Sequence, residues 1–246
     1  MAAYRSPQRV PGQLLALITP NAGFEREVVT RLLTAALLLC ALAASAADVT
    51  VKVADKQPPG EIDPSIRSLL QTKAIQVVSG DKPVYEFWPV KELPLQSKPA
   101  SPAKALDAVK QASLLGVVAV PAAKRDYRDD ELAPGSYTMR FALQPQDGNH
   151  SGSAEFPYFA VLVPAKLDTK PDGIKDYKEL VKISAKETST DHPVVMSLRP
   201  AASAEGEAKL TEPAPEHKAV RIKVPAKGPE TTAIAFEIVF EGKGHK

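Results

Sequence analysis

The chain has 246 residues, with 31 Lys and Arg, 29 Asp and Glu and a formal net charge of +2. Residues 1–46 hold four of the basic and two of the acidic residues, which leaves 27 of each in residues 47–246. This balance argues against nucleic acid as a partner, because recognition of nucleic acid needs a basic patch. The single cysteine, Cys40, lies in the first segment, so an ordinary apolar core must stabilise the rest of the chain.

Residues 31–47 contain the three parts of a secretory signal peptide. Arg31 supplies the positive charge, an apolar run follows it, and Ala-Ser-Ala at 44–46 is a small-residue cleavage site. The apolar run is short for a membrane span, which needs ~20 residues. We therefore predict cleavage after Ala46 or Ala47. The expected product is exported, periplasmic or extracellular, with no membrane span after cleavage.

Two further features of this segment leave alternatives open. A lipidated Cys40 would end the apolar run, but Leu39 stands where a small residue is expected before such a cysteine. Residues 1–28 show no strong periodicity and precede the charge by more than signal peptides usually do. One explanation is a translation start at Val28 or Val29, read from a GUG codon. The other is a long extension at the N-terminus.

After residue 46 the sequence predicts short strands joined by stiff turns. Twenty of the 23 prolines lie there, about twice the usual ~5%. Apolar residues alternate with polar ones, or run continuously, over short stretches that turn residues separate. The expected strands are 48–54, 74–79, 82–90, 114–120, 137–143, 156–163, 194–198, 220–224 and 234–240.

Helical patterns are few. Asp63 and Pro64 favour a helical turn over 64–70, because Asp is a good N-cap and Pro suits the first helical position. Residues 103–112 are compatible with a short helix. Apolar residues at helical spacing predict one amphipathic helix over 172–187, lying on a sheet. Residues 201–215 are rich in Ala, Glu and Pro and are expected to form a flexible, less ordered surface loop.

The order of these elements indicates the fold class. Strands follow one another without the strand–helix alternation of a parallel sheet, and no internal repeat is evident. We therefore predict a mainly all-β domain over residues 47–246, preceded by the N-terminal extension and signal peptide of residues 1–46. The expected architecture is an antiparallel immunoglobulin-like two-sheet sandwich with one appended helix.

The polar loop 144–155, between the expected strands 137–143 and 156–163, has the highest density of chemically capable side chains. Asp147, His150 and their small polar neighbours lie within it. Glycines and short polar side chains let a backbone bend and satisfy its own hydrogen bonds. One interpretation is a long connecting loop with a structural histidine, and the other is a binding loop carried on a rigid scaffold.

The candidate metal ligands are Asp147, His150 and His192. Two histidines from separate loops and a carboxylate can hold a divalent metal such as zinc or copper. The alternative is that these are surface or hydrogen-bonding histidines, since they lack a compact spacing such as HExxH. No other cofactor is expected.

Enzymatic motifs are missing from the sequence. Asp147, His150 and Ser151 are the residue types of a serine hydrolase, but sequence neighbours rarely reach the geometry of nucleophile and base, and the G-x-S-x-G elbow is absent. The adjacent Asp129 and Asp130 would point apart, so they do not form the carboxylate pair of a glycosidase. We therefore expect a protein that is not an enzyme.

One segment carries a family resemblance. The string PGSYTMRFALQPQDGNHSG at 134–152, followed by FAVLVPA at 159–165, resembles an uncharacterised family of exported bacterial proteins. Its members have a Pro-Gly turn, a Tyr-Thr strand, an Asp-Gly-x-His-x-Gly loop and a second apolar strand. The resemblance covers residues 134–165 and implies an exported β-sandwich protein, with no activity attached.

These observations lead to one functional expectation and one alternative. We expect an exported, non-enzymatic binding or structural module that acts through loop 144–155. Its partner is a protein or a small ligand that the sequence does not identify. The alternative is a periplasmic metal-binding protein that uses Asp147 and His150 with a second histidine.

Overall fold

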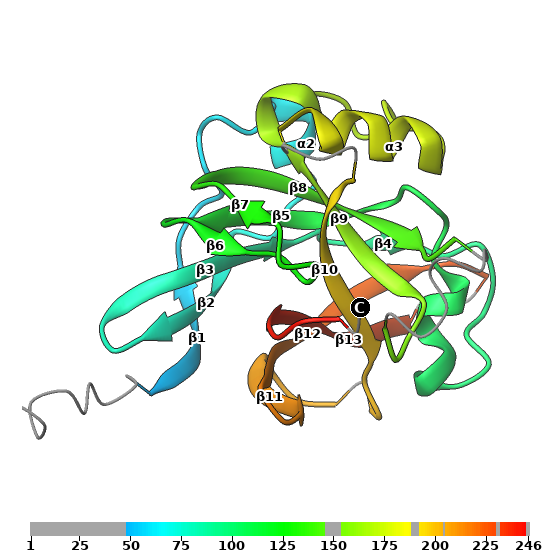
Figure 1. The fold of residues 1–246 in the computed structure, drawn as a ribbon. Helices are drawn as coiled ribbons and strands as arrows, with labels where there is room; N and C mark the ends of the chain where they lie inside the picture. The colour runs from blue at the N-terminus through cyan, green and yellow to red at the C-terminus, as the bar shows by residue number, and fades with distance from the viewer. Residues whose placement is uncertain (1–47, 146–153, 188–191, 204, 230–231, 245–246) are drawn as a thin grey trace, which may run out of the picture. The chain divides into compact units, whose positions relative to one another are not determined.

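The computed structural model describes residues 48–145, 154–187, 192–203, 205–229 and 232–244. In this part the chain is mainly β, as predicted, with one large curled sheet and one small two-stranded sheet. Figure 1 shows the strands winding around a central region and the two helices α2 and α3 at the top of the view.

The large sheet has eleven strands, and ten of them follow one hydrogen-bonded path in which neighbours are antiparallel. The short strand β4 pairs with β12 in parallel, and β6 pairs with β7 in the small sheet. Along the path the strands are β1 (Val49–Asp55), β2 (Lys73–Ser79), β3 (Lys82–Pro89), β5 (Leu114–Val120), β8 (Gly135–Leu143), β9 (Tyr158–Pro164), β10 (Val194–Pro200), β13 (Thr232–Glu241), β12 (His217–Lys227) and β11 (Lys209–Ala214). The others are β4 (Leu93–Pro94), β6 (Lys124–Arg125) and β7 (Glu131–Leu132).

The curl of the sheet brings its two ends together. β1 and β11 are the terminal strands of the path, and they lie beside each other. No ladder of hydrogen bonds joins them in the part of the chain that the structure describes. We call this unpaired line between β1 and β11, continued along the adjacent edge of β12, the seam.

A large apolar core fills the inside of the curl. Side chains of successive residues point to opposite faces of a strand, so each alternating strand contributes every second residue to it. Trp88, Phe87, Phe141 and Phe236 are fully buried there. A smaller cluster around Val163 and Leu180 packs between the sheet and α3.

The helical turn at Asp63 is as predicted. α2 (Pro64–Arg67) begins with proline, and the Asp63 Oδ1 accepts a hydrogen bond from the Ser65 N–H at 2.9 Å. Residues 103–112 contain the 3₁₀ helix η1 (Pro102–Ala108), and short 3₁₀ turns occur at η2 (Ala165–Leu167) and η3 (Ala185–Glu187). The buried residues of α2 and η1, Ile66 and Leu106 among them, join the main core.

The appended helix and the proline-rich loop differ from expectation. The helix expected over 172–187 is confined to α3 (Tyr177–Ser184), because Asp176 caps it, accepting a hydrogen bond from the Glu179 N–H at 2.9 Å. The loop expected over 201–215 contains the strand β11. Pro213 interrupts the alternating pattern from which a strand is predicted. An edge strand nevertheless tolerates proline, because one of its sides makes no ladder bonds.

Candidate functional site

The predicted metal ligands are not brought together in the described residues. Asp147 and His150 lie outside them, and His192 is exposed just before β10. Among the residues with described positions, no three His, Cys, Asp or Glu side chains are close enough to share a metal ion. His217 lies between two backbone carbonyls, with Nδ1 2.9 Å from the Pro215 oxygen. The metal site therefore stays a prediction.

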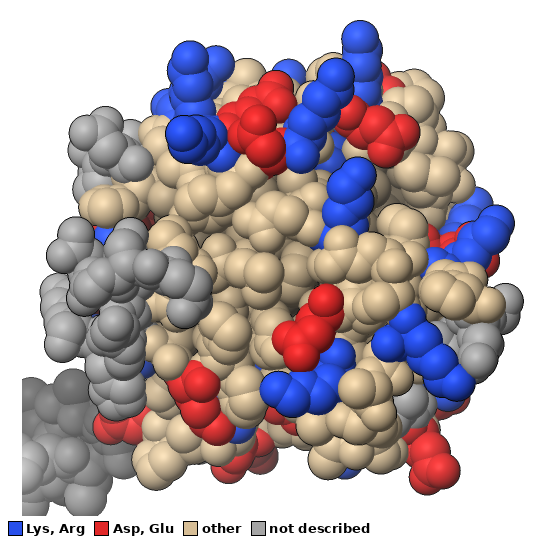
Figure 2. Space-filling model, turned by 90° about the vertical axis from the view of Figure 1, so that its right-hand side faces the viewer, with Lys and Arg blue, Asp and Glu red and all other residues tan. Residues whose placement is uncertain are grey.

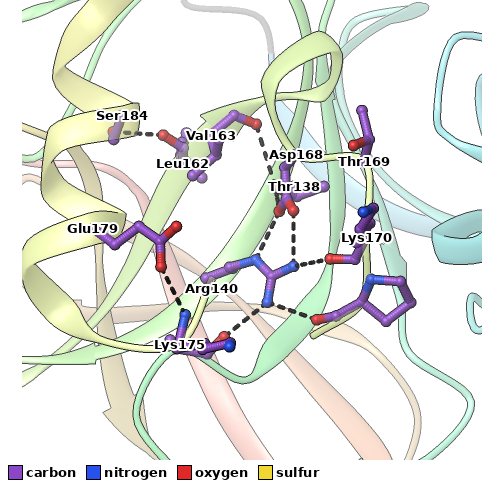
Figure 3. Close-up of polar contacts among 12 residues, drawn as sticks. Thr138, Arg140, Leu162, Val163, Asp168, Thr169, Lys170, Lys175, Glu179 and Ser184 are labelled. Atoms are coloured by element: carbon purple, nitrogen blue, oxygen red, sulfur yellow. Dashed lines mark hydrogen bonds and ion pairs between the residues drawn. The ribbon is translucent and has the colours of Figure 1, made fainter. Parts of the chain in front are cut away.

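Arg140 on β8 and Asp168 form a deeply buried ion pair (Figure 3). Both side chains are 1% exposed. The Arg140 Nε donates to the Asp168 Oδ2 at 2.7 Å and Nη2 donates to Oδ1 at 2.8 Å, a bidentate pair. The Thr138 hydroxyl also donates to Oδ2, at 2.5 Å.

The rest of the Arg140 guanidinium is bound by backbone oxygens. Nη1 donates to the carbonyls of Ala112 and Pro171 at 2.9 and 3.0 Å, and Nη2 donates to that of Lys170 at 3.0 Å. All five N–H groups are thus used, which leaves none for a ligand. This cluster fastens the segment after β9 and the residues before β5 to the sheet, and we assign it to the fold.

Asp126 is a second buried carboxylate, and its contacts are also structural. Its two oxygens accept hydrogen bonds from the backbone N–H groups of Arg128, Asp130 and Val195, at 2.8 to 3.0 Å. Burial raises the pKa of Asp126, although the three N–H donors oppose that rise. The side chain closes the β6–β7 turn and attaches it to β10.

Tyr85 and Tyr158 are buried side chains whose pKa values are strongly raised. Burial, together with its hydrogen bond to the Asp107 carboxylate, raises the pKa of Tyr158 to about 12. The contact joins β9 to η1. Like the two carboxylates, Tyr158 is occupied within the fold.

An open groove of about 880 Å³ lies at one end of the seam. This volume is within the ~300–1,000 Å³ usual for ligand sites. Four strands line it, namely the last parts of β1 and β12 and the first parts of β2 and β13. The other lining residues directly precede β11, follow α2 or follow β3. We call it the seam groove and define it by Val53, Lys73, Ile75, Lys91, Glu207, Lys223 and Pro225.

The floor of the seam groove is apolar and its rim is mostly cationic. Val53 and Ile75 are cross-strand partners, so they point to the same face of the sheet. Ile75 is 7% exposed, whereas Val53 is 48% exposed, although Val49 and Val51 on the same face of β1 pack against the core. The inner face of the sheet thus reaches solvent here.

Three lysines and one glutamate supply the charge of the groove. Lys73 lies 3.8 Å from the exposed Asp55 carboxylate, and the Lys91 Nζ donates to the Ser68 carbonyl at 2.7 Å. Lys223 projects from β12, where it is exposed. With Glu207 as the one acidic lining residue, the lining has an excess of two positive charges at neutral pH.

Along β1 the backbone groups of odd-numbered residues point into the seam. The Gly80 N–H donates to the Asp48 carbonyl, so even-numbered residues of β1 face β2. The β1–β2 register is continuous from Val49 to Asp55, so this alternation persists to the end of the strand. The N–H and C=O of Val53 therefore point away from β2, toward the groove.

β12 also directs backbone groups toward the groove. The Leu95 N–H donates to the Lys227 carbonyl at 2.7 Å, so odd-numbered residues of β12 face away from β13. On that edge β11 pairs as far as Arg221, and β4 begins to pair only at Ala226. The N–H and C=O of Lys223 therefore lie at an edge that no described strand covers.

The residues of this groove could not be predicted from the sequence alone. Its members come from separate segments between Val53 and Ala233, and no two of the charged ones are close in sequence. The regular alternation of Val49, Val51 and Val53 did predict β1, but it gave no sign that Val53 would be exposed. Only the curl of the sheet, which places β1 near β12, creates the site.

Comparison with models of known protein families, with curated proteins and with solved structures finds no match to this chain.

Proposed function

We propose that this protein is a non-enzymatic binding module that holds its ligand in the seam groove. The observation that carries the proposal is the groove itself, an opening of about 880 Å³ where apolar side chains, lysines and unpaired strand edges converge. The buried polar side chains Arg140, Asp168, Asp126 and Tyr158 are engaged in contacts within the fold. They offer no nucleophile or base to a substrate.

The surface charge supports a partner other than nucleic acid. On the face drawn in Figure 2, Lys and Arg lie interspersed with Asp and Glu, and the middle of that face is largely uncharged. We propose a protein or small-molecule partner. Among the described residues, no helix is both long and apolar enough to cross a membrane.

Export, the immunoglobulin-like sandwich and the binding role of loop 144–155 enter this proposal from the sequence. The signal-peptide pattern of residues 31–47 supports a periplasmic or extracellular location. The mainly antiparallel strands support a sandwich-like arrangement, in which β10 to β13 would form one layer. A metal role for Asp147, His150 and His192 stays a prediction, which elemental analysis of untagged protein would test.

Labelling the rim of the groove tests the proposal. In the full chain carrying Cys40→Ser, Glu207→Cys supplies a single thiol for an environment-sensitive fluorophore. Glu212→Cys, on β11 and exposed but outside the groove, is the matched control. The probes are a pool of mixed-sequence octapeptides, decanoate, maltotriose and adenosine monophosphate.

We expect at least one of these probes to change the fluorescence at position 207 in a saturable way, with no change at position 212. Equal changes at both positions would show non-specific adsorption. The proposal fails in that case, and it fails equally if none of the four probes alters the label at position 207.

A further inference from the structure

We propose that the seam groove binds an acidic peptide segment in an extended conformation, which adds as a strand between β1 and β12. This inference rests on the proposed function, because it names the class of ligand for the same groove. It follows from three properties of the groove, namely its free backbone groups, its alternating side-chain faces and its charge.

Unpaired backbone N–H and C=O groups of two strands face the groove. Val53 on β1 and Lys223 on β12 each direct an N–H and a C=O toward the groove. An extended peptide carries N–H and C=O groups on both of its edges, so it can hydrogen-bond to β1 on one side and to β12 on the other. A ligand without repeated amide groups would leave these groups to water.

The side chains of the groove match the two faces of such a strand. Val53 and Ile75 form an apolar floor on the inner face of the sheet, while Lys223 lies on the outer face of β12. Residues of an added strand point alternately to the two faces. A segment in which apolar residues alternate with acidic ones would therefore place the former on the floor and the latter on the outer face, where Lys223 is exposed.

Charge also decides between possible occupants. The chain's own N-terminal segment, residues 1–46, has four arginines and two glutamates, and its last residues include Lys243 and Lys246. The N-terminal segment has the same sign as the groove, and Lys243 is held by the Asp129 carboxylate at 2.9 Å, so both are poor occupants. The β1 strand of a second copy, VTVKVAD, has no net charge and gains nothing from the lysines. An acidic segment of another protein fits best.

The first experiment compares peptides by calorimetric titration into the full chain at low ionic strength. The peptides are end-blocked octamers of alternating Glu and Val, the same octamer with Gln in place of Glu, and the Glu-Val octamer N-methylated at every second residue. We expect the Glu-Val peptide to bind at least about tenfold more tightly than the Gln-Val peptide, and raised salt to reduce this difference. N-methylation, which removes the amide donors of one edge, should weaken binding at least about tenfold.

The second experiment changes the edge of β1. Val53→Pro removes an N–H that faces the groove, whereas the ladder to β2 uses the N–H groups of even-numbered residues. The variant should therefore stay folded and lose at least about tenfold in affinity for the Glu-Val peptide. Val53→Ala shortens the same side chain but keeps the N–H, and it should retain most of the affinity. Ala54→Pro removes a donor to β2 and should lower the midpoint of thermal unfolding instead.

The third experiment concerns the lysines. Replacing Lys223 by Ala should weaken binding of the Glu-Val peptide roughly two- to fivefold, the range for a partly exposed ion pair. The control is Lys182→Ala on α3, which should have no effect.

Several outcomes would overturn the inference. Equal affinity for the Glu-Val and Gln-Val peptides would show that the lysines do not select an acidic ligand. Equal affinity for the Glu-Val peptide and its N-methylated form would show that the peptide does not bind as an added strand. Decanoate that binds where no peptide does would keep the proposed function and reject the peptide. A dimer of the full chain that Val53→Pro dissociates would identify a second copy as the occupant and reject the peptide likewise.

Discussion

Replacing Asp168 by Asn should destabilise the protein more than any exposed charge change. The Asp168 carboxylate accepts three hydrogen bonds, two from the Arg140 guanidinium and one from the Thr138 hydroxyl. Asn keeps the shape but loses the charge, and its NH₂ group would face a donor of Arg140 or Thr138. The guanidinium, 1% exposed, would remain buried without a counter-ion.

The expected loss follows from that burial. Removing one partner of a buried ion pair costs about 3–5 kcal/mol, because an uncompensated charge stays in the interior. The matched control is Glu241→Gln, which breaks the exposed contact to Lys218 at 2.6 Å. A surface pair contributes about 0–1 kcal/mol, so the control should be close to wild type.

Urea unfolding followed by the fluorescence of Trp88 measures both variants. Trp88 is the only tryptophan and is fully buried, so its emission reports the loss of the core. We expect the free energy of unfolding of Asp168→Asn to fall by about 3–5 kcal/mol with an unchanged slope against urea. A loss no larger than that of Glu241→Gln would refute the assignment of the Arg140 cluster to the fold.

Three further predictions use other contacts. Gly116→Ala should destabilise the fold by about 1–3 kcal/mol or more in urea unfolding, because a Cβ there would lie 2.4 Å from the Trp88 carbonyl oxygen. Gly60→Ala, with no atom within 4 Å, should be neutral, and equal losses would contradict this. Asp176→Ala should cost about 1 kcal/mol by removing the cap of α3, and unchanged stability would show that the cap is dispensable. Spectrophotometric titration should show one tyrosine with a pKa of about 12 that Tyr158→Phe removes. Because the folded pKa is raised, the neutral phenol stabilises the fold fully below pH ~10, and this contribution is lost as the pH rises from ~10 through about 12.

The sequence predicted most strands because their signal is local. Alternation of apolar and polar residues, as in β1, shows which side of a strand faces the core, and the structure keeps that side for Val49 and Val51. The N-cap at Asp63 is likewise a contact between near neighbours. β11 was missed because its Pro213 and its polar residues remove the alternating pattern, while its pairing with β12 is tertiary.

The burial of Arg140 and its contacts with backbone carbonyls could not be predicted, because they too depend on tertiary structure. In β8 the residues Thr138, Arg140 and Ala142 read as the polar or small face of a strand, which suggests exposure. The structure covers that face with the segment after β9, and the carbonyls of Lys170 and Pro171 bind the guanidinium. The local sequence pattern does not indicate that carbonyls from a distant segment will bind the Arg140 guanidinium.

The two terminal strands of the sheet are protected to different degrees. β11 contains Pro213 and a register shift before Ala214, two features that discourage pairing with another chain. β1 pairs with β2 in seven consecutive positions without a bulge or a proline, and only Lys52 adds a charge in the middle of the strand. A regular, unprotected edge of this kind invites another strand. Because β11 covers β1 from beside it but β12 is left open near Lys223, the seam groove is where a strand could enter. The absence of protection on β1 is therefore consistent with an edge that is used for binding.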